Sequence, residues 1–202
     1  MDNLDNLLAK AKEEINKNPN GHLILLLRKE IYKELGEHKL DSNDHAIITK
    51  GLQRRVQLAI LCVSHVLDIW EEAAPEDDSP RVFIESINNY LKGELDWKSL
   101  WNMQNSFWTV LDNYSEEDRF AVAAYVGYAC ARAVLVALFD EDIDNTENLL
   151  DEDLDAFSWD TAFFNSLACT DNDSYNSETK INKRREFWLW YLNEAVPQAT
   201  QI

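Results

Sequence analysis

Acidic side chains spaced two residues apart are the part of this sequence most suited to binding a cation. Five oxygen-bearing side chains match positions 1, 3, 5, 9 and 12 of a calcium-binding EF-hand loop: Asp140, Asp142, Asp144, Asn148 and Asp151. The match is imperfect. Asn145 replaces the usual Gly, Glu147 stands where an apolar residue is usual, and Asp151 replaces the longer Glu that closes the ligand shell. Because acid-rich stretches produce such matches by chance, a calcium site is only a minor alternative.

The histidine, cysteine and serine residues show no catalytic pattern. The four histidines have no paired metal-ligand spacing: His22, His38, His45 and His65. Cys62 and His65 lie one helical turn apart, but a zinc site needs two further ligands and no matching pair follows. The dipeptide Ser64-His65 lacks a third member of a catalytic triad. The sequence therefore predicts no catalytic residue, no metal site, no cofactor and no enzymatic activity.

The acidic residues are concentrated in one segment. Of the 37 acidic residues, 13 lie between Asp140 and Glu178, a span without Lys or Arg. The rest of the chain has 24 acidic and 19 basic residues, so most of the net charge of −18 belongs to this span. It is either a solvated loop or a surface complementary to a cationic partner. The second interpretation assigns partner binding to six carboxylates: Asp140, Asp142, Asp144, Asp151, Asp153 and Asp155.

Composition restricts the class of protein. The chain is 46% hydrophobic but contains only 5 Gly and 4 Pro, which favours long helices over a turn-rich β fold. Direct binding to nucleic acid is disfavoured by the net charge of −18, because phosphates are neutralised by Lys and Arg.

The sequence also predicts where the protein resides. The three cysteines, Cys62, Cys130 and Cys169, are odd in number and widely spaced, which favours free thiols in a reducing compartment. The N-terminus lacks a signal peptide, and Arg132 interrupts the longest apolar stretch, 121–139. We expect a cytoplasmic protein without a membrane span.

Hydrophobic periodicity and helix-end signals predict an all-α bundle of about seven to eight helices with an acidic, loop-rich insertion before the last helices. The main expected helices cover 2–17, 22–35, 44–74, 80–92, a Trp-rich stretch from 97, 115–139 and 178–196. A bend is expected near Gly51. Ser79 is predicted to cap the helix that begins at Pro80, and Ser115 with Asp118 resembles a capping box for the central helix.

A single domain, 1–202, accounts for this pattern. It comprises an N-terminal helical hairpin, 1–40, packed on a core, 44–139, followed by the acidic segment, 140–178, and a C-terminal helix, 179–197. Within the core, Trp97, Trp101 and Trp108 fall near one helical face. Their spacing is typical first of core packing and second of a binding stripe.

Two segments together resemble a known family. EEAAPEDDSPRVFIESINNYLKGE, at 71–94, follows an apolar helix, and KRREFWLWYLNEAVP covers 183–197. With the Ala-rich stretch between them, they resemble the helical immunity proteins of bacterial polymorphic toxin systems, in particular the fifth numbered immunity family. The resemblance covers about 52–197. The positions that match the family motif are Asp77, Asp78, Pro80, Arg81, Gly93 and Glu94.

The resemblance implies a stoichiometric inhibitor that binds a cognate toxin domain and blocks its active site or substrate path. The acidic surface suggests a cationic toxin, in particular a nuclease, because nucleases are basic where they grip nucleic acid. The alternative is a helical adaptor or scaffold, unrelated to toxins, that binds another protein through the Trp-rich face. The sequence does not determine an oligomeric state.

Overall fold

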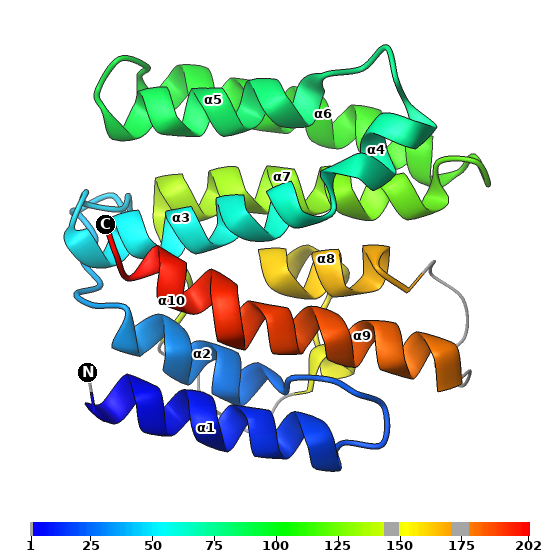
Figure 1. Cartoon of the computed structure of the whole chain (residues 1–202). Coiled ribbons are helices and arrows are strands. Elements are labelled where there is room, and N and C mark those ends of the chain that lie inside the picture. Colours follow the sequence, from blue (N-terminus) through cyan, green and yellow to red (C-terminus); the bar gives the residue numbers. More distant parts are fainter. Residues whose placement is uncertain (1, 144–149, 171–177) are drawn as a thin grey trace.

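The computed structural model describes residues 2–143, 150–170 and 178–202, and these residues form a helical bundle (Figure 1). Its α-helices are α1 (Asp2–Lys17), α2 (Leu25–Glu34), α3 (Lys50–His65), α4 (Leu67–Ala73), α5 (Ser79–Leu91), α6 (Trp97–Ser115), α7 (Ala121–Phe139), α8 (Thr161–Ala168), α9 (Glu178–Trp190) and α10 (Val196–Ala199). The described residues contain no β-strand, only an isolated bridge between Leu40 and Ala46. The predicted all-α class is confirmed.

The helices are more numerous than the seven or eight predicted, because one expected helix, 44–74, is divided. Its first part, α3, begins only at Lys50, where the Thr49 side chain accepts a hydrogen bond from the Leu52 amide. The break lies at Val66, whose backbone leaves the helical region, and not near Gly51. The short helix α8 adds a further element inside the segment that was expected to be mainly loop.

The central helix α7 is the hub of the bundle, as predicted. It packs against α3, α4, α5, α6 and α8. Its many alanines and Gly127 allow these helices to approach closely, and a Cβ atom added at Gly127 would lie 2.9 Å from the Trp70 ring. The helix begins at Ala121, whereas Ser115 ends α6, so the predicted capping box is not formed.

By length and composition, α7 could cross a membrane, but 67% of its apolar stretch is buried inside the protein. That burial is what a central core helix requires, since its apolar residues are covered by protein.

Buried apolar side chains form two clusters that meet on α3. Val56 and Val63 belong to the cluster around α7, whereas Leu58 and Cys62 belong to a second cluster around the C-terminal helix. Because these residues alternate between two sides of α3, this helix is buried on both sides. In Figure 1 the α5–α6 pair lies beyond α3 and α7 on one side, and α1 and α2 lie beyond α9 and α10 on the other.

The C-terminal helix continues through a wider turn. After α9, residues Tyr191–Ala195 form a π-helical turn that leads directly into α10. Tyr191, Leu192 and Ala195 are all fully buried, so the turn directs three side chains into the second core cluster. The hairpin of α1 and α2 covers this cluster from outside, with α1 packed against α9.

Candidate partner-binding surface

Asp140, the first residue of the predicted acidic surface, lies inside the protein. It ends α7 with a φ of 67° and pairs with Arg55 of α3, whose Nε and Nη2 donate to the two carboxylate oxygens at 2.6 and 2.7 Å. Both side chains are completely buried. The remaining Arg55 donors bond to the backbone carbonyls of Tyr32, Gly36 and Glu37. This carboxylate therefore joins α7 to α3 and is not available to a partner.

Asp151 is buried for the same reason. Its two carboxylate oxygens accept hydrogen bonds from Nη1 and Nη2 of Arg28 on α2, while the Nε of Arg28 donates to Asp160 at 2.7 Å. Burial alone would lower the pKa of Arg28, but Asp160 and Asp151 outweigh it and the pKa is raised. Asp160 also caps α8 by accepting from the Phe163 amide. Asp140 and Asp151, two of the six carboxylates predicted to bind a partner, are therefore buried and paired with arginines.

The other described residues of the predicted partner-binding set are exposed to solvent. Asp142 is exposed and lies 3.1 Å from the Lys29 ammonium. Asp153 and Asp155 are exposed, and each accepts a local backbone hydrogen bond, from the amides of Leu150 and Phe157 respectively. Asp144 lies outside the described residues.

Glu141, next to Asp140, is a buried carboxyl group. Burial raises its pKa to about 7, and the nearby Asp160 acts in the same direction. Glu141 therefore retains its proton to a higher pH than an exposed glutamate does. Among the described acids between 140 and 153, Asp140, Glu141 and Asp151 are buried.

The described residues contain no group of three or more His, Cys, Asp or Glu placed to hold a metal ion. Asp140 and Asp151 stand at the first and last positions of the EF-hand match, and they form ion pairs with Arg55 and Arg28. Two of its other positions, Asp144 and Asn148, lie outside the described residues. Cys62 is buried, and the His65 ring stacks on the Trp190 ring with centroids 3.6 Å apart, so both residues take part in packing.

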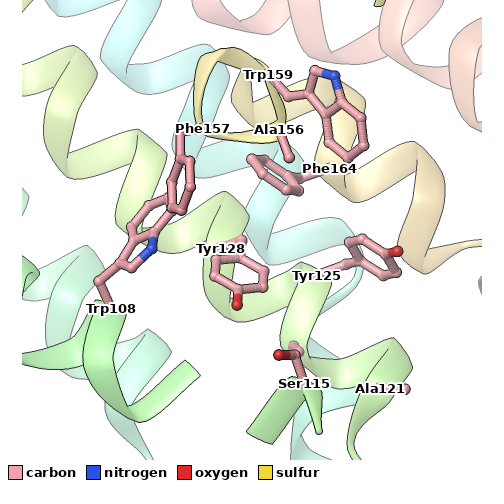
Figure 2. A pocket seen from close by; sticks show the side chains of 10 residues that line it. Trp108, Ser115, Ala121, Tyr125, Tyr128, Ala156, Phe157, Trp159 and Phe164 are labelled. Carbon is pink, nitrogen blue, oxygen red and sulfur yellow. The ribbon is translucent and has the colours of Figure 1, made fainter. Parts of the chain in front are cut away.

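An aromatic pocket of about 320 Å³ lies between α6, α7, α8 and the short 3₁₀-helix Ala156–Ser158 (Figure 2). Six aromatic rings line it: Trp108, Tyr125, Tyr128, Phe157, Trp159 and Phe164. Phe157 is 61% exposed, the largest exposed fraction among the large hydrophobic side chains of the described residues. Its ring packs against Trp108 with centroids 5.2 Å apart, and Figure 2 shows the pair on one side of the pocket with Tyr125 on the other.

The rim of this pocket is acidic. Tyr128 donates to the Asp112 carboxylate at 3.1 Å, and Asp155 caps the turn that carries Phe157. Further exposed acids lie in neighbouring segments: Glu116, Glu117 and Asp118 in the turn between α6 and α7, and Asp153 at the end of the 3₁₀-helix Asp151–Asp153. Arg119, in the turn between α6 and α7, pairs with Glu117 at 3.0 Å, and a nitrogen of Arg132 on α7 lies 3.5 Å from the Phe157 carbonyl. We name this feature, the six rings with Asp112, Asp153 and Asp155, the acidic aromatic face.

The family-motif residue Asp77 holds the turn between α4 and α5. Its carboxylate accepts from the Ser79 amide at 2.9 Å and from the Tyr114 hydroxyl at 3.0 Å, and its carbonyl accepts from the Trp70 indole at 2.7 Å. The prediction of Ser79 as N-cap is therefore wrong, because the N-cap position is occupied by Asp78, whose side chain makes no capping bond. Ser79 is the first residue of α5, and the Asp77 side chain satisfies its amide.

The other motif positions support the same region. Asp78 is exposed, and Pro80 is buried with its carbonyl 3.7 Å from the Cys130 sulfur. Arg81 donates to Glu71 at 2.6 Å. Gly93 adopts a φ of 77° after α5, and the amide of the exposed Glu94 donates to a backbone carbonyl of that helix. The motif forms helix ends and contacts between α4 and α5, and it lies on different elements from the aromatic pocket.

Three important residues were not singled out by sequence reasoning. Arg28 and Asp160 form a buried pair, and Phe157 is the exposed edge of the pocket. Asp160 carried a signal, since an Asp before the apolar stretch 161–168 is typical of an N-cap. An arginine in the otherwise apolar stretch 23–28 also indicated a buried charge that needs a partner. Phe157 had no local signal, because one aromatic residue in an acidic stretch has no periodicity.

The described residues thus define an all-helical protein whose most distinctive surface is an aromatic pocket with carboxylates around it, a surface suited to recognition. The chain matches the family model of immunity protein Imm5 over residues 8–198, and it belongs to this family. The predicted resemblance is confirmed, and membership implies the function of an immunity protein that binds a cognate toxin protein. A search of curated proteins found no significant match.

Proposed function

We propose that this immunity protein neutralises a basic nuclease toxin by binding it stoichiometrically, without catalysis, in the cytoplasm. Family membership implies that the partner is a toxin protein, but it does not identify the toxin. The observation that supports a basic toxin is the acidic aromatic face, where exposed carboxylates surround an apolar pocket. The adaptor alternative loses its basis, because the family match covers almost the whole chain.

Binding at this face suits the physics of nuclease inhibition. A nuclease holds nucleic acid through Lys and Arg, which neutralise phosphates. Carboxylates grouped on an inhibitor compete for the same groups and attract them over a distance of about 10 Å at 0.1 M ionic strength. The rings of the pocket provide the apolar centre that protein interfaces need for affinity, while the acids around them set orientation and association rate.

Buried acids have a different role in this proposal. Asp140, Asp151 and Asp160 fix α2, α3, α7 and α8 relative to one another through Arg28 and Arg55. They hold the elements on which the exposed acids lie and do not touch the partner. At the acidic aromatic face the proposed binding acids are therefore Asp153, Asp155 and Asp112, while the exposed Asp142, paired with Lys29 of α2, adds negative charge outside that face.

Co-expression tests the function. The toxin domain encoded beside this chain should kill cells when expressed alone and should not when this protein is also present. Titration calorimetry of the two purified proteins should give one toxin bound per chain, and a nuclease assay should show loss of cleavage at that ratio. Cell death in the presence of the folded chain would overturn the proposal. Protection without any nuclease activity in the toxin would overturn its nuclease part.

A further inference from the structure

The aromatic pocket has the composition of a site for one cationic side chain. Six aromatic rings line it, and a cation over the electron-rich face of such a ring is attracted by the ring quadrupole. At about 320 Å³ the pocket is at the lower end of the range of about 300–1,000 Å³ typical of ligand sites. This size suits a single inserted side chain and not a helix.

Charge complementarity identifies the occupant. The pocket wall contains the Tyr128 phenol and the Ser115 hydroxyl, which interact with each other, and the Tyr128 hydroxyl donates to the exposed carboxylate of Asp112. Asp155 lies on the opposite element, two residues before Phe157. An apolar occupant would leave these acids facing an uncharged surface, whereas a guanidinium can stack on the rings and bond to a carboxylate at once.

The occupant comes from outside the described chain. Of the nearby arginines, Arg119 stacks on Phe120 with its central carbon 4.2 Å from the ring centroid, and Arg132 lies at the Phe157 carbonyl. Neither lines the pocket. Phe157 leaves 61% of its side chain exposed beside the opening, so its ring is available to contact another surface.

We propose that the pocket bounded by Trp108, Tyr128 and Phe157 is the docking site for an arginine side chain of the toxin. The inference rests on the proposed function, because the arginine belongs to the cognate toxin. The arginine stacks on the aromatic rings and its guanidinium donates to the Asp112 carboxylate. It acts as the central anchor of the interface, while Asp153 and Asp155 contact the surrounding basic surface.

A model ligand tests the pocket without the toxin. N-acetyl-arginine methylamide is titrated into the full-length protein and followed by NMR, with the neutral isostere N-acetyl-citrulline methylamide as the matched probe. The arginine probe should shift the Trp108 indole and Phe157 ring signals with a Kd on the order of millimolar, as one cation–π contact with a charged hydrogen bond provides. The citrulline probe should shift them several-fold less. Equal shifts with both probes, or none with either, would overturn the inference.

Variants then connect the pocket to the toxin. Phe157→Ala removes the exposed ring, and Asp112→Asn keeps the shape of the rim but removes its charge. Each should weaken toxin binding by about tenfold or more, as for an interface anchor. Val82→Ala, which changes an exposed residue of α5, should leave binding within about twofold. If wild-type protein protects cells and Phe157→Ala binds the toxin as tightly as wild type, the inferred arginine site is wrong but the proposed function stands. If wild-type protein gives no protection, the proposed function itself fails.

Discussion

Arg55 and Asp140 are 85 residues apart in sequence, yet they meet through two hydrogen bonds of 2.6 and 2.7 Å in the interior. Asp140 ends the central helix at a positive φ, and its own carboxylate also accepts from the Glu141 amide at 2.8 Å. The pair therefore determines where the chain leaves α7 and enters the acidic segment. A carboxylate that seemed part of a binding surface is instead part of the core.

Removing one member of this pair should be strongly destabilising. Asp140→Asn leaves the Arg55 guanidinium buried without its counter-charge, so the free energy of unfolding should fall by about 3–5 kcal/mol. Urea denaturation followed by circular dichroism measures the change. Asp142→Asn provides the control, because Asp142 is exposed and its pair with Lys29 contributes only about 0–1 kcal/mol. Equal effects of the two variants would contradict the buried role of Asp140.

Glu141 should make stability fall as pH rises. Its pKa is 4.5 in the unfolded chain and about 7 in the folded protein, so the folded form retains a proton that the unfolded form loses between these values. The loss should total about 3 kcal/mol by pH 8. Glu141→Gln should remove it, and the variant should differ most from wild type above pH 7 and little near pH 4.5. Urea midpoints across this range measure the effect.

His22 should make stability fall as pH decreases, which is opposite to the effect of Glu141. Burial, with Arg184 and Arg28, lowers its pKa to about 3, so its contribution to stability is complete above pH 6.5 and is lost as pH falls below that value. Since wild type and Glu141→Gln share His22, the difference between them isolates Glu141. A difference that does not change with pH would show that Glu141 titrates normally.

Glycine substitutions should separate close packing from backbone strain. A Cβ atom at Gly51 would lie 2.3 Å from the Glu37 carbonyl oxygen and 2.6 Å from the Gly36 carbonyl carbon. Because backbone cannot yield easily, Gly51→Ala should cost about 3 kcal/mol or more. Gly93 has a φ of 77° but open space around it, so Gly93→Ala should cost only about 1–2 kcal/mol. Thermal denaturation should show that Gly51→Ala is less stable than Gly93→Ala. The opposite result would mean that helix α3 shifts to make room for the added Cβ atom.

The exposed acids should control the rate of association with the toxin. The triple variant Asp142→Asn, Asp153→Asn, Asp155→Asn should slow association several-fold at low salt, and the difference should shrink towards 1 M salt, where charges are screened within about 3 Å. Asn at 155 can still cap its turn. Stopped-flow mixing measures the rates. A matched triple variant removes the same charge elsewhere: Glu13→Gln, Glu72→Gln and Glu94→Gln. Equal slowing by both would attribute the effect to net charge alone.

Asp77 should matter for stability and not for recognition. Asp77→Ala removes the bonds to the Ser79 amide and the Tyr114 hydroxyl, which should lower the free energy of unfolding by about 1–2 kcal/mol. Toxin affinity at a temperature where the variant is folded should stay within about twofold of wild type. Tyr114→Phe should reproduce part of the stability loss. A large loss of affinity in folded Asp77→Ala would place the family motif in the interface.

Much of the fold could be predicted from the sequence because helix formation is local. The first helix, Asp2–Lys17, and the central role of α7 follow from apolar spacing and small residues. The break at Val66 could not be predicted, because the residues 52–74 continue the helical pattern without Gly or Pro. There the packing of α3 and α4 on α7 overrides local preference.

The site was predicted less completely. Sequence showed that acids gather between Asp140 and Glu178, and it indicated a cationic partner. It could not separate the buried Asp140 and Asp151 from the exposed Asp153 and Asp155, since all four are the same residue type in the same segment. Arg55 and Arg28, the partners of the buried Asp140 and Asp151, lie at least 85 residues away from them along the chain.

The sequence by itself determined the all-helical class, the resemblance to immunity proteins and the position of the acidic segment, because these depend on neighbouring residues and on composition. Only the tertiary structure decided which acids face solvent and how Trp108 meets Phe157. The physical reason is that the free energy of a buried charge depends on a partner brought close by folding, and a pocket exists only where distant elements pack.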